Sequence, residues 1–122
     1  MRLHILPLRL AVCRLDPDAP IPSWANGAFT SITRTADELS IVCDEDSVPA
    51  DARAVRGRRV IVIEGPIPFE ETGIAAALLT PLAEAKISVL LISTYDTDYL
   101  LVQDESFERA CDVLRAAGHV VS

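Results

Sequence analysis

Two acidic side chains, Asp96 and Asp98, follow shortly after the apolar run 87–93 and are separated by one threonine. A carboxylate pair of this kind could hold a Mg²⁺ or Ca²⁺ ion, or could place one carboxylate as a nucleophile. A metal site needs further oxygen ligands, and this loop contains none, although Asp104 and Glu105 are near in sequence. A phosphatase of the Asp-x-Asp type needs a lysine further along the chain, and the only lysine, Lys86, lies upstream. We therefore interpret the pair as neither a metal site nor a nucleophilic centre.

The cysteines and histidines do not form a known site either. Cys13, Cys43 and Cys111 are widely spaced, and each lies in an apolar run without a Cys-x-x-Cys pair, so we interpret them as core residues. The two histidines, His4 and His119, lie far apart in the sequence, and no Ser, His and carboxylate triad can be argued from it. No Gly-x-Gly-x-x-Gly, P-loop or Gly-x-Ser-x-Gly motif occurs. We expect no enzyme activity, no metal and no cofactor.

The composition is that of a small folded protein. The chain has 122 residues, is 50% hydrophobic and carries a net charge of −7. Because it is acidic, it lacks the positive surface that binds nucleic-acid phosphates. Its apolar stretches are far shorter than the roughly 20 residues of a membrane span. We expect a cytoplasmic protein with reduced thiols that binds neither nucleic acid nor a membrane.

The second half of the chain predicts alternating strands and helices. Strands are expected at 58–63, 87–93, 99–102 and 119–121, and helices at 69–85 and 104–117. Pro81 lies inside the first helix and should kink or split it. Asp104 is expected to cap the start of the second helix, and Gly118 to follow its end. The order β-α-β-β-α-β is the ferredoxin-like arrangement.

The first half of the chain predicts strands but no comparable helices. Residues 3–15 are compatible with a strand, and 16–22 must be irregular because they contain three prolines. A hairpin is expected from 29–34 and 38–43, followed by a weak helical patch within 44–56.

An internal repeat relates the two halves. Residues 32–45 resemble residues 92–105 at a spacing of 60, which places Glu38 opposite Asp98 and Thr33 opposite Ser93. The first copy has the proline-rich loop where the second has its first helix. We infer two copies of one module, an abbreviated one at 1–56 and a full one at 57–122.

The segment 70–102, and above all Ser93-Thr94-Tyr95-Asp96-Thr97-Asp98-Tyr99, resembles the ACT domains of the CASTOR-type family. This family includes the arginine sensors of animal cells and small bacterial proteins with two ACT modules, whose first module residues 29–43 also resemble. The resemblance implies an α+β fold of tandem ferredoxin-like βαββαβ (ACT) modules, the first abbreviated here. Such modules pair side by side and bind amino acids at the seam. The animal sensors carry four modules in one chain, so a chain with two implies a homodimer.

The resemblance also implies which residues face the ligand. By position, the loop and helix start contribute Glu71, Thr72, Gly73 and Ile74. The turn beneath contributes Thr94, Tyr95 and Asp98, and the neighbouring module contributes Ser88 and Val89. Which amino acid is bound does not follow from the resemblance.

The chemistry of these side chains fits a zwitterion. The start of a helix offers free backbone N–H groups and the positive end of its dipole to a carboxylate, and Gly73 leaves room for close approach. Asp98 or Glu71 could accept hydrogen bonds from an ammonium or guanidinium group, and Thr94 and Ser88 supply hydroxyls. Two simpler explanations stay open, since Glu71 and Thr72 are ordinary residues for a helix start and Asp98 could merely close its turn.

From these observations we predict a non-catalytic sensor that binds an amino acid at ACT-module interfaces of a homodimer and regulates a protein partner. The alternative prediction is a protein–protein interaction module without a ligand.

Overall fold

The computed structural model describes residues 1–122, which divide into two compact units. Unit 1 comprises Met1–Pro7 and Arg59–Ser122, and unit 2 comprises Leu8–Arg58. Two long strands, β1 (Arg2–Leu15) and β4 (Ala54–Ile63), each run from one unit into the other. The expected boundary between residues 56 and 57 lies close to the point where the chain re-enters unit 1, whereas residues 1–7 group with the C-terminal segment.

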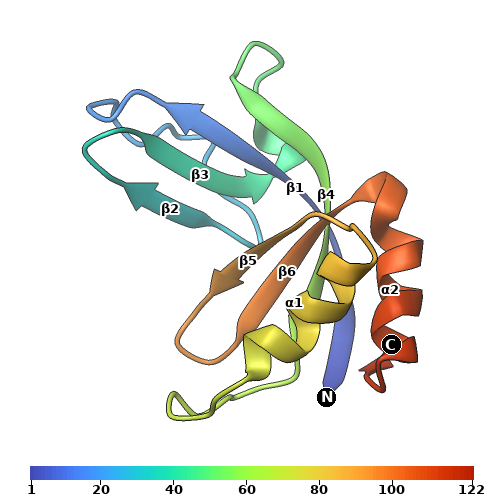
Figure 1. The fold of residues 1–122 in the computed structure, drawn as a ribbon. Coiled ribbons are helices and arrows are strands. Elements are labelled where there is room, and N and C mark those ends of the chain that lie inside the picture. The colour runs from blue at the N-terminus through green and yellow to red at the C-terminus, as the bar shows by residue number, and fades with distance from the viewer. The chain divides into compact units, whose positions relative to one another are not determined.

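Unit 1 has the ferredoxin-like order of elements that the sequence predicts. After β4 come α1 (Ile74–Glu84), β5 (Val89–Ser93), β6 (Asp98–Gln103), α2 (Phe107–Ala116) and β7 (Val120–Val121). Its sheet has the order β1-β4-β6-β5, with β7 parallel to the beginning of β1. The start of β1 thus lies between β7 and β4, and β5 is an edge strand bonded only to β6. Figure 1 shows this arrangement, with both helices beside the strands of unit 1.

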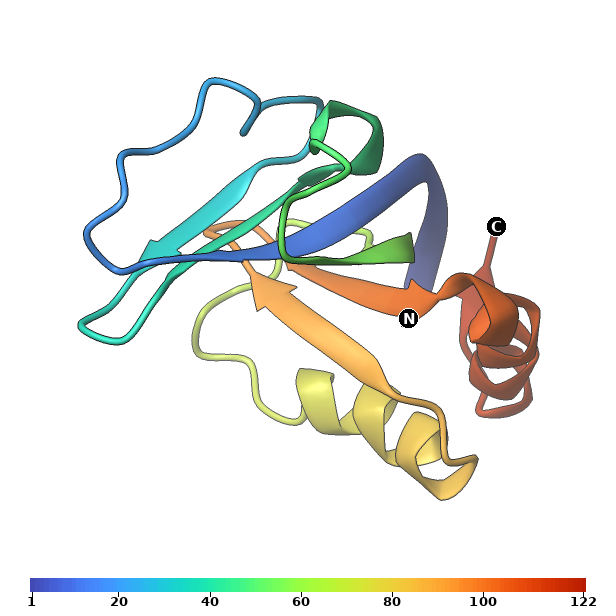
Figure 2. The same ribbon diagram turned by 90° about the horizontal axis from the view of Figure 1, so that it is seen from above.

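The core of unit 1 is formed by side chains of its helices and of its strands. Figure 2 shows α1 beside the strands β5 and β6 of this unit. Leu78 and Leu82 lie one turn apart on α1, so they share a face of that helix. Alternate strand residues point to the same side of a sheet, which accounts for the burial of Ile61 with Ile63. The fully buried side chains of this core include Leu3, Ile61, Leu78, Leu82, Leu100, Val102, Ala110 and Leu114.

The helices begin later than the sequence predicts. The expected helix 69–85 begins at Ile74, because prolines precede it and Gly73 has a left-handed φ of 80°. The N-cap of α2 is Ser106 rather than Asp104, because Asp104–Ser106 form a 3₁₀ turn before the helix. Gly118 follows α2 with a φ of 98°, which confirms its predicted role.

Pro81 does not split α1, which runs without a break from Ile74 to Glu84. Proline has no N–H, which leaves the carbonyl of Ala77 without its helical donor. In the structure, Nε2 of His119 lies 3.2 Å from the Ala77 carbonyl oxygen and can donate to it. The histidine thereby supplies the hydrogen bond that the proline removes.

Neither α1 nor α2 has the length and apolar character that a membrane-spanning helix requires.

Unit 2 is an abbreviated counterpart without an α-helix. It contains β2 (Ser31–Arg34), β3 (Leu39–Asp44), the 3₁₀ turn η1 (Glu45–Ser47), most of β1 and the start of β4, in the order β2-β3-β1-β4. The helical patch expected within 44–56 is therefore wrong apart from this single turn, which the Asp44 carboxylate caps. Loop residues such as Trp24 pack against the core of this unit, formed by Ala11, Cys13, Leu39, Ile41, Cys43 and Val48.

The β2–β3 and β5–β6 hairpins have the same kind of turn, and the two turns lie 59 residues apart rather than the predicted 60. The amide of Thr35 donates to Glu38, and the amide of Thr94 donates to Thr97 in the same way, at 2.9 and 2.8 Å. The strands leave these turns at Leu39 and Asp98. Leu39, not Glu38, is therefore the counterpart of Asp98. A shift by one residue turns every side chain to the opposite face of a strand, so the correction matters for the site.

Candidate functional site

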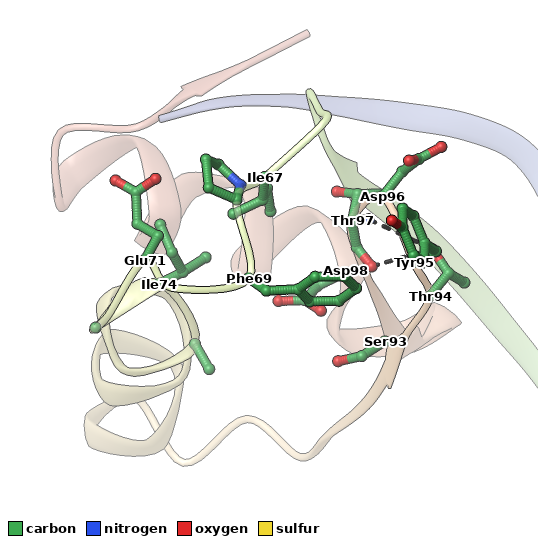
Figure 3. A pocket seen from close by; sticks show the side chains of 13 residues that line it. Ile67, Phe69, Glu71, Ile74, Ser93, Thr94, Tyr95, Asp96, Thr97 and Asp98 are labelled. Atoms are coloured by element: carbon green, nitrogen blue, oxygen red, sulfur yellow. Dashed lines mark hydrogen bonds between the residues drawn. The ribbon is translucent and has the colours of Figure 1, made fainter.

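A cavity of about 310 Å³ lies in unit 1 between the beginning of α1 and the turn of the β5–β6 hairpin. A volume of this size suits a small metabolite. Figure 3 shows the side chains around it. The cavity is lined by Ile67, Pro68, Phe69, Glu71, Gly73, Ile74, Ala75, Ser93, Thr94, Tyr95, Asp96, Thr97 and Asp98.

The helix side of the cavity offers backbone donors. Gly73 is the N-cap of α1, and no side chain caps this end or places an acid in the first turn. The first amide bonded within the helix is that of Ala77, which donates to the Gly73 carbonyl at 3.0 Å. The amides before it have no helical acceptor and carry the positive end of the helix dipole. This end of α1 can therefore bind an anionic group.

The opposite side of the cavity carries a carboxylate that has no partner. Asp98 is half-buried at the first position of β6, and its side chain makes no hydrogen bond or ion pair in the structure. In Figure 3 it points from the strand toward the start of α1, whereas the carboxylates of Asp96 and Glu71 point away from the space between them. No Lys, Arg or His lines the cavity. Its electrostatic character therefore favours a cationic group near Asp98.

Two exposed aromatic rings lie at the mouth of the cavity. Phe69 and Tyr95 pack edge to face with ring centroids 4.9 Å apart, and they are 70% and 81% exposed. Exposed rings of this kind can cover an apolar part of a ligand or contact a cation through their faces.

The turn itself is held by hydrogen bonds on both sides. The hydroxyl of Thr94 caps the turn through the Thr97 backbone, and the hydroxyl of Thr97 donates to the Ile63 carbonyl at 2.7 Å. The amide of Ile67 donates to the Asp96 carbonyl at 2.7 Å. These bonds connect the hairpin to the loop that carries Phe69 and Glu71.

The structure brings together six of the nine predicted site residues around one cavity: Glu71, Gly73, Ile74, Thr94, Tyr95 and Asp98. Thr72 lies between lining residues but does not line the cavity itself. Ser88 and Val89 lie at the other end of β5 from Ser93, so they do not reach this cavity within the chain. Sequence reasoning did not single out Ile67, Pro68, Phe69, Ala75, Ser93 and Thr97, and only the proline-rich stretch 65–68 signalled a loop there.

A second polar cluster lies at the surface of unit 1. Nδ1 of His4 is 3.2 Å from the Ser122 hydroxyl, and its Nε2 is 3.0 Å from the Glu64 carboxylate. The sequence did not indicate this combination. The His4 and Glu64 side chains are 42% and 52% exposed, so water screens their interaction. No group of three or more His, Cys, Asp or Glu side chains is arranged to hold a metal ion.

Comparison with protein families decides the membership of the chain. An ACT domain model matches residues 53–116, which is more than half of the sequence. The chain belongs to the ACT domain family. A model of an N-terminal domain matches residues 9–51, ahead of the ACT domain.

Individual proteins agree with this assignment. The ACT protein is 27% identical to the cytosolic arginine sensor for mTORC1 subunit 1 of Bos taurus, over 97% of this chain and 45% of the relative. The chain thus spans less than half of that curated relative. An Agrobacterium tumefaciens protein of known crystal structure is 42% identical to this chain in sequence. The two structures superpose with a TM-score of 0.93 over 99% of this chain and 91% of the other. A Vibrio cholerae protein of unknown function shares the fold, with a TM-score of 0.76 at 21% identity over 95% and 88% of the two chains.

Proposed function

We propose that this ACT protein is a non-catalytic sensor that binds an α-amino acid in the cavity of unit 1. The observation that supports this most is the placement of the α1 start and Asp98 on opposite sides of one cavity of about 310 Å³. The uncapped amides would receive the α-carboxylate, and the Asp98 carboxylate would receive a cationic group of the ligand. Binding would then favour one conformation of the protein and so regulate a protein partner.

The lining also indicates which amino acids to test first. The Asp98 carboxylate faces the cavity and no cationic side chain lines it, so a ligand with an acidic side chain would be repelled. The curated relatives are named as arginine sensors, and an arginine side chain would complement both this carboxylate and the exposed rings. We therefore take L-arginine as the first candidate and acidic amino acids as negative controls.

A homodimer explains how Ser88 and Val89 would join the site. β5 is an edge strand of the unit 1 sheet, and its sequence Val-Leu-Leu-Ile-Ser has no charge. If two copies pair antiparallel about Leu91, Val89 of one chain lies opposite Ser93 of the other. Ser93 lines the cavity, so this pairing would bring the partner's Val89 and Ser88 to its edge. We propose this dimer, in the cytoplasm, as the binding form.

Unit 2 does not offer a second site of the same design. At the position equivalent to Asp98 it has Leu39, which is fully buried in the core of that unit. It also has no helix whose start could receive a carboxylate. We therefore expect one amino acid per chain, or two per dimer, from isothermal titration calorimetry.

A thermal-shift screen of all proteinogenic L-amino acids at millimolar concentration tests the proposal. A ligand that binds only the folded state raises the melting temperature by mass action. We expect a shift with L-arginine or another non-acidic amino acid and none with L-aspartate or L-glutamate. D-arginine is the matched control, because it has the same charges with the opposite chirality. No shift with any amino acid, while the dimer is intact, would contradict the proposed function.

A second function, a protein-docking module without a ligand, is favoured by the exposure of Phe69 and Tyr95. Large exposed rings close together are frequent at protein interfaces. The two functions differ in the effect of Phe69→Ser, which removes an exposed ring but neither Asp98 nor the helix start. A docking module would lose its partner and show no amino-acid shift, whereas the sensor would keep a measurable shift.

A further inference from the structure

We infer that Thr97 is a positioning residue for the binding site, because its hydroxyl fixes the turn from which Asp98 faces the cavity. This inference rests on the proposed function. It assigns to the Thr97 side chain the role of determining where the neighbouring carboxylate lies.

The first observation is the bond itself. The Thr97 hydroxyl donates to the carbonyl oxygen of Ile63 at 2.7 Å, in a partly buried position. Ile63 is the last residue of β4, so the bond joins the hairpin turn to a strand of the sheet. Because Thr97 directly precedes Asp98, fixing its side chain restricts the backbone that carries the carboxylate.

The second observation is the close approach of the neighbouring loop. The amide of Ile67 donates to the Asp96 carbonyl at 2.7 Å. A Cβ atom at Gly65 would lie 3.0 Å from the same carbonyl oxygen and 3.2 Å from the Thr97 Cβ. The loop and the turn therefore touch through backbone at Asp96, directly before Thr97, and a side chain at Gly65 would press on this contact.

The third observation comes from the related hairpin in unit 2. It has the same turn, capped by Thr35 as the first is capped by Thr94. At the place of Thr97 it has Glu38, and at the place of Asp98 it has Leu39. Glu38 makes no hydrogen bond through its side chain to another strand. The two hairpins thus have the same turn with the same threonine cap. The hydroxyl bond to β4 is made only in the β5–β6 hairpin, which is the one that carries Asp98.

The direct test replaces the hydroxyl and keeps the shape. Thr97→Val is nearly isosteric and leaves the Ile63 carbonyl without its donor. We expect it to weaken the binding of L-arginine, or of whichever amino acid the wild type binds in the screen, by about tenfold, equivalent to about 1.4 kcal/mol. Thr97→Ser keeps the hydroxyl and should restore most of the affinity. Titrations are made well below the melting temperature, so that a loss of global stability alone does not change the measured affinity.

Thr35→Val is the matched control. It makes the same chemical change in the equivalent hairpin and removes a turn cap, but it lies in unit 2. It should lower the melting temperature and leave the affinity unchanged. If Thr97→Val and Thr35→Val have the same effect on affinity, or if Thr97→Ser binds no better than Thr97→Val, the positioning role is wrong.

Two further measurements keep the inference separate from the proposed function. Gly65→Ala should also weaken binding, because its Cβ presses on the turn while the Thr97 hydroxyl itself is kept. Amide hydrogen exchange needs no ligand: in Thr97→Val the Ile67 amide should exchange about tenfold faster, while in Thr35→Val it should not. If the wild type binds no amino acid, the proposed function fails, and unchanged exchange at Ile67 would then overturn the positioning role as well.

Discussion

Asp98 differs from the other carboxylates of the cavity in direction and burial. It is half-buried and points toward the start of α1, whereas Asp96 is exposed and points away. We expect Asp98→Asn, which removes the charge and keeps the shape, to weaken amino-acid binding by about ten- to a hundredfold, since a hydrogen bond to a charged group contributes about 1.5–3 kcal/mol. Calorimetric titration measures this change.

Asp96→Asn is the control for this prediction. It removes the same charge two residues away, and because that carboxylate points into solvent, screening should limit its effect to less than about twofold. Equal losses for the two variants would mean that the ligand responds to the overall negative charge of the turn and not to the Asp98 side chain.

Burial of the Cys111 thiol should make the free energy of unfolding decrease at alkaline pH. Burial raises the pKa of Cys111 above its ordinary value of 9.0, so the folded chain keeps this proton to higher pH than the unfolded chain. The protonated thiol therefore contributes fully to the free energy of unfolding below the pKa it has in the unfolded chain. This contribution is lost as the pH rises through the higher pKa of the folded chain. We expect the free energy of unfolding to fall above pH 9.0, and to fall less steeply in Cys111→Ala. Parallel curves for the two proteins, measured by urea unfolding, would refute this expectation.

At the level of elements, the start of α1 depends on a glycine for its backbone. Gly73 has a φ of 80°, and a Cβ there would meet no atom within 4 Å, so an alanine would be strained without a clash. We expect Gly73→Ala to lower the free energy of unfolding by about 1 kcal/mol and to weaken amino-acid binding, because the strain shifts the amides of the first turn. Urea unfolding and calorimetry measure the two effects.

Gly118 supplies the comparison within the same unit. It has a φ of 98°, also with open space at the Cβ position, but it follows the end of α2. Gly118→Ala should lower the free energy of unfolding by about as much as Gly73→Ala does, and should leave the affinity for the amino acid unchanged. If both alanine variants bind equally well, the conformation of Gly73 serves the fold alone.

The elements of unit 1 could be predicted because each has a periodic apolar pattern and a boundary residue. The spacing of Leu78 and Leu82, the alternation in β6 and the glycine at 118 all correspond to what the structure contains. The sequence predicts the start of α1 too early, because the composition of 69–73 is compatible with a helix, whereas the preceding prolines and the left-handed backbone of Gly73 delay it. Pro81 is tolerated because a distant histidine provides the missing donor, which no local pattern reveals.

The site could be predicted only where a resemblance supplied it. Residues close in sequence, such as Gly73 with Ile74 or Thr94 with Asp98, were found together because the turn and the helix start are local. Phe69 and Thr97 were missed because their importance depends on contacts with Tyr95 and Ile63, which lie far away in the chain. The repeat was aligned one residue out, because short apolar strands match each other almost equally well at neighbouring offsets.

At the level of the whole molecule, the proposed site includes two residues that one chain does not bring to the cavity. Within one chain, Ser88 and Val89 lie at the far end of β5 from the cavity. The chain spans less than half of its curated relative. The proposed homodimer would supply these two residues from an identical chain through the edge strand β5, which has no charged residue.

Leu90→Lys tests the dimer at that strand. Leu90 is 40% exposed on β5, and a charge on an edge strand opposes pairing with another chain. We expect the wild type to sediment as a dimer and Leu90→Lys as a monomer with at least about tenfold weaker amino-acid binding, since the partner's Ser88 and Val89 are lost. Val120→Lys, which places the same charge at a 54% exposed position on β7, should stay dimeric and bind normally. If the wild type sediments as a monomer and binds the amino acid, or if monomeric Leu90→Lys binds it as tightly as the wild type, one chain completes the site alone.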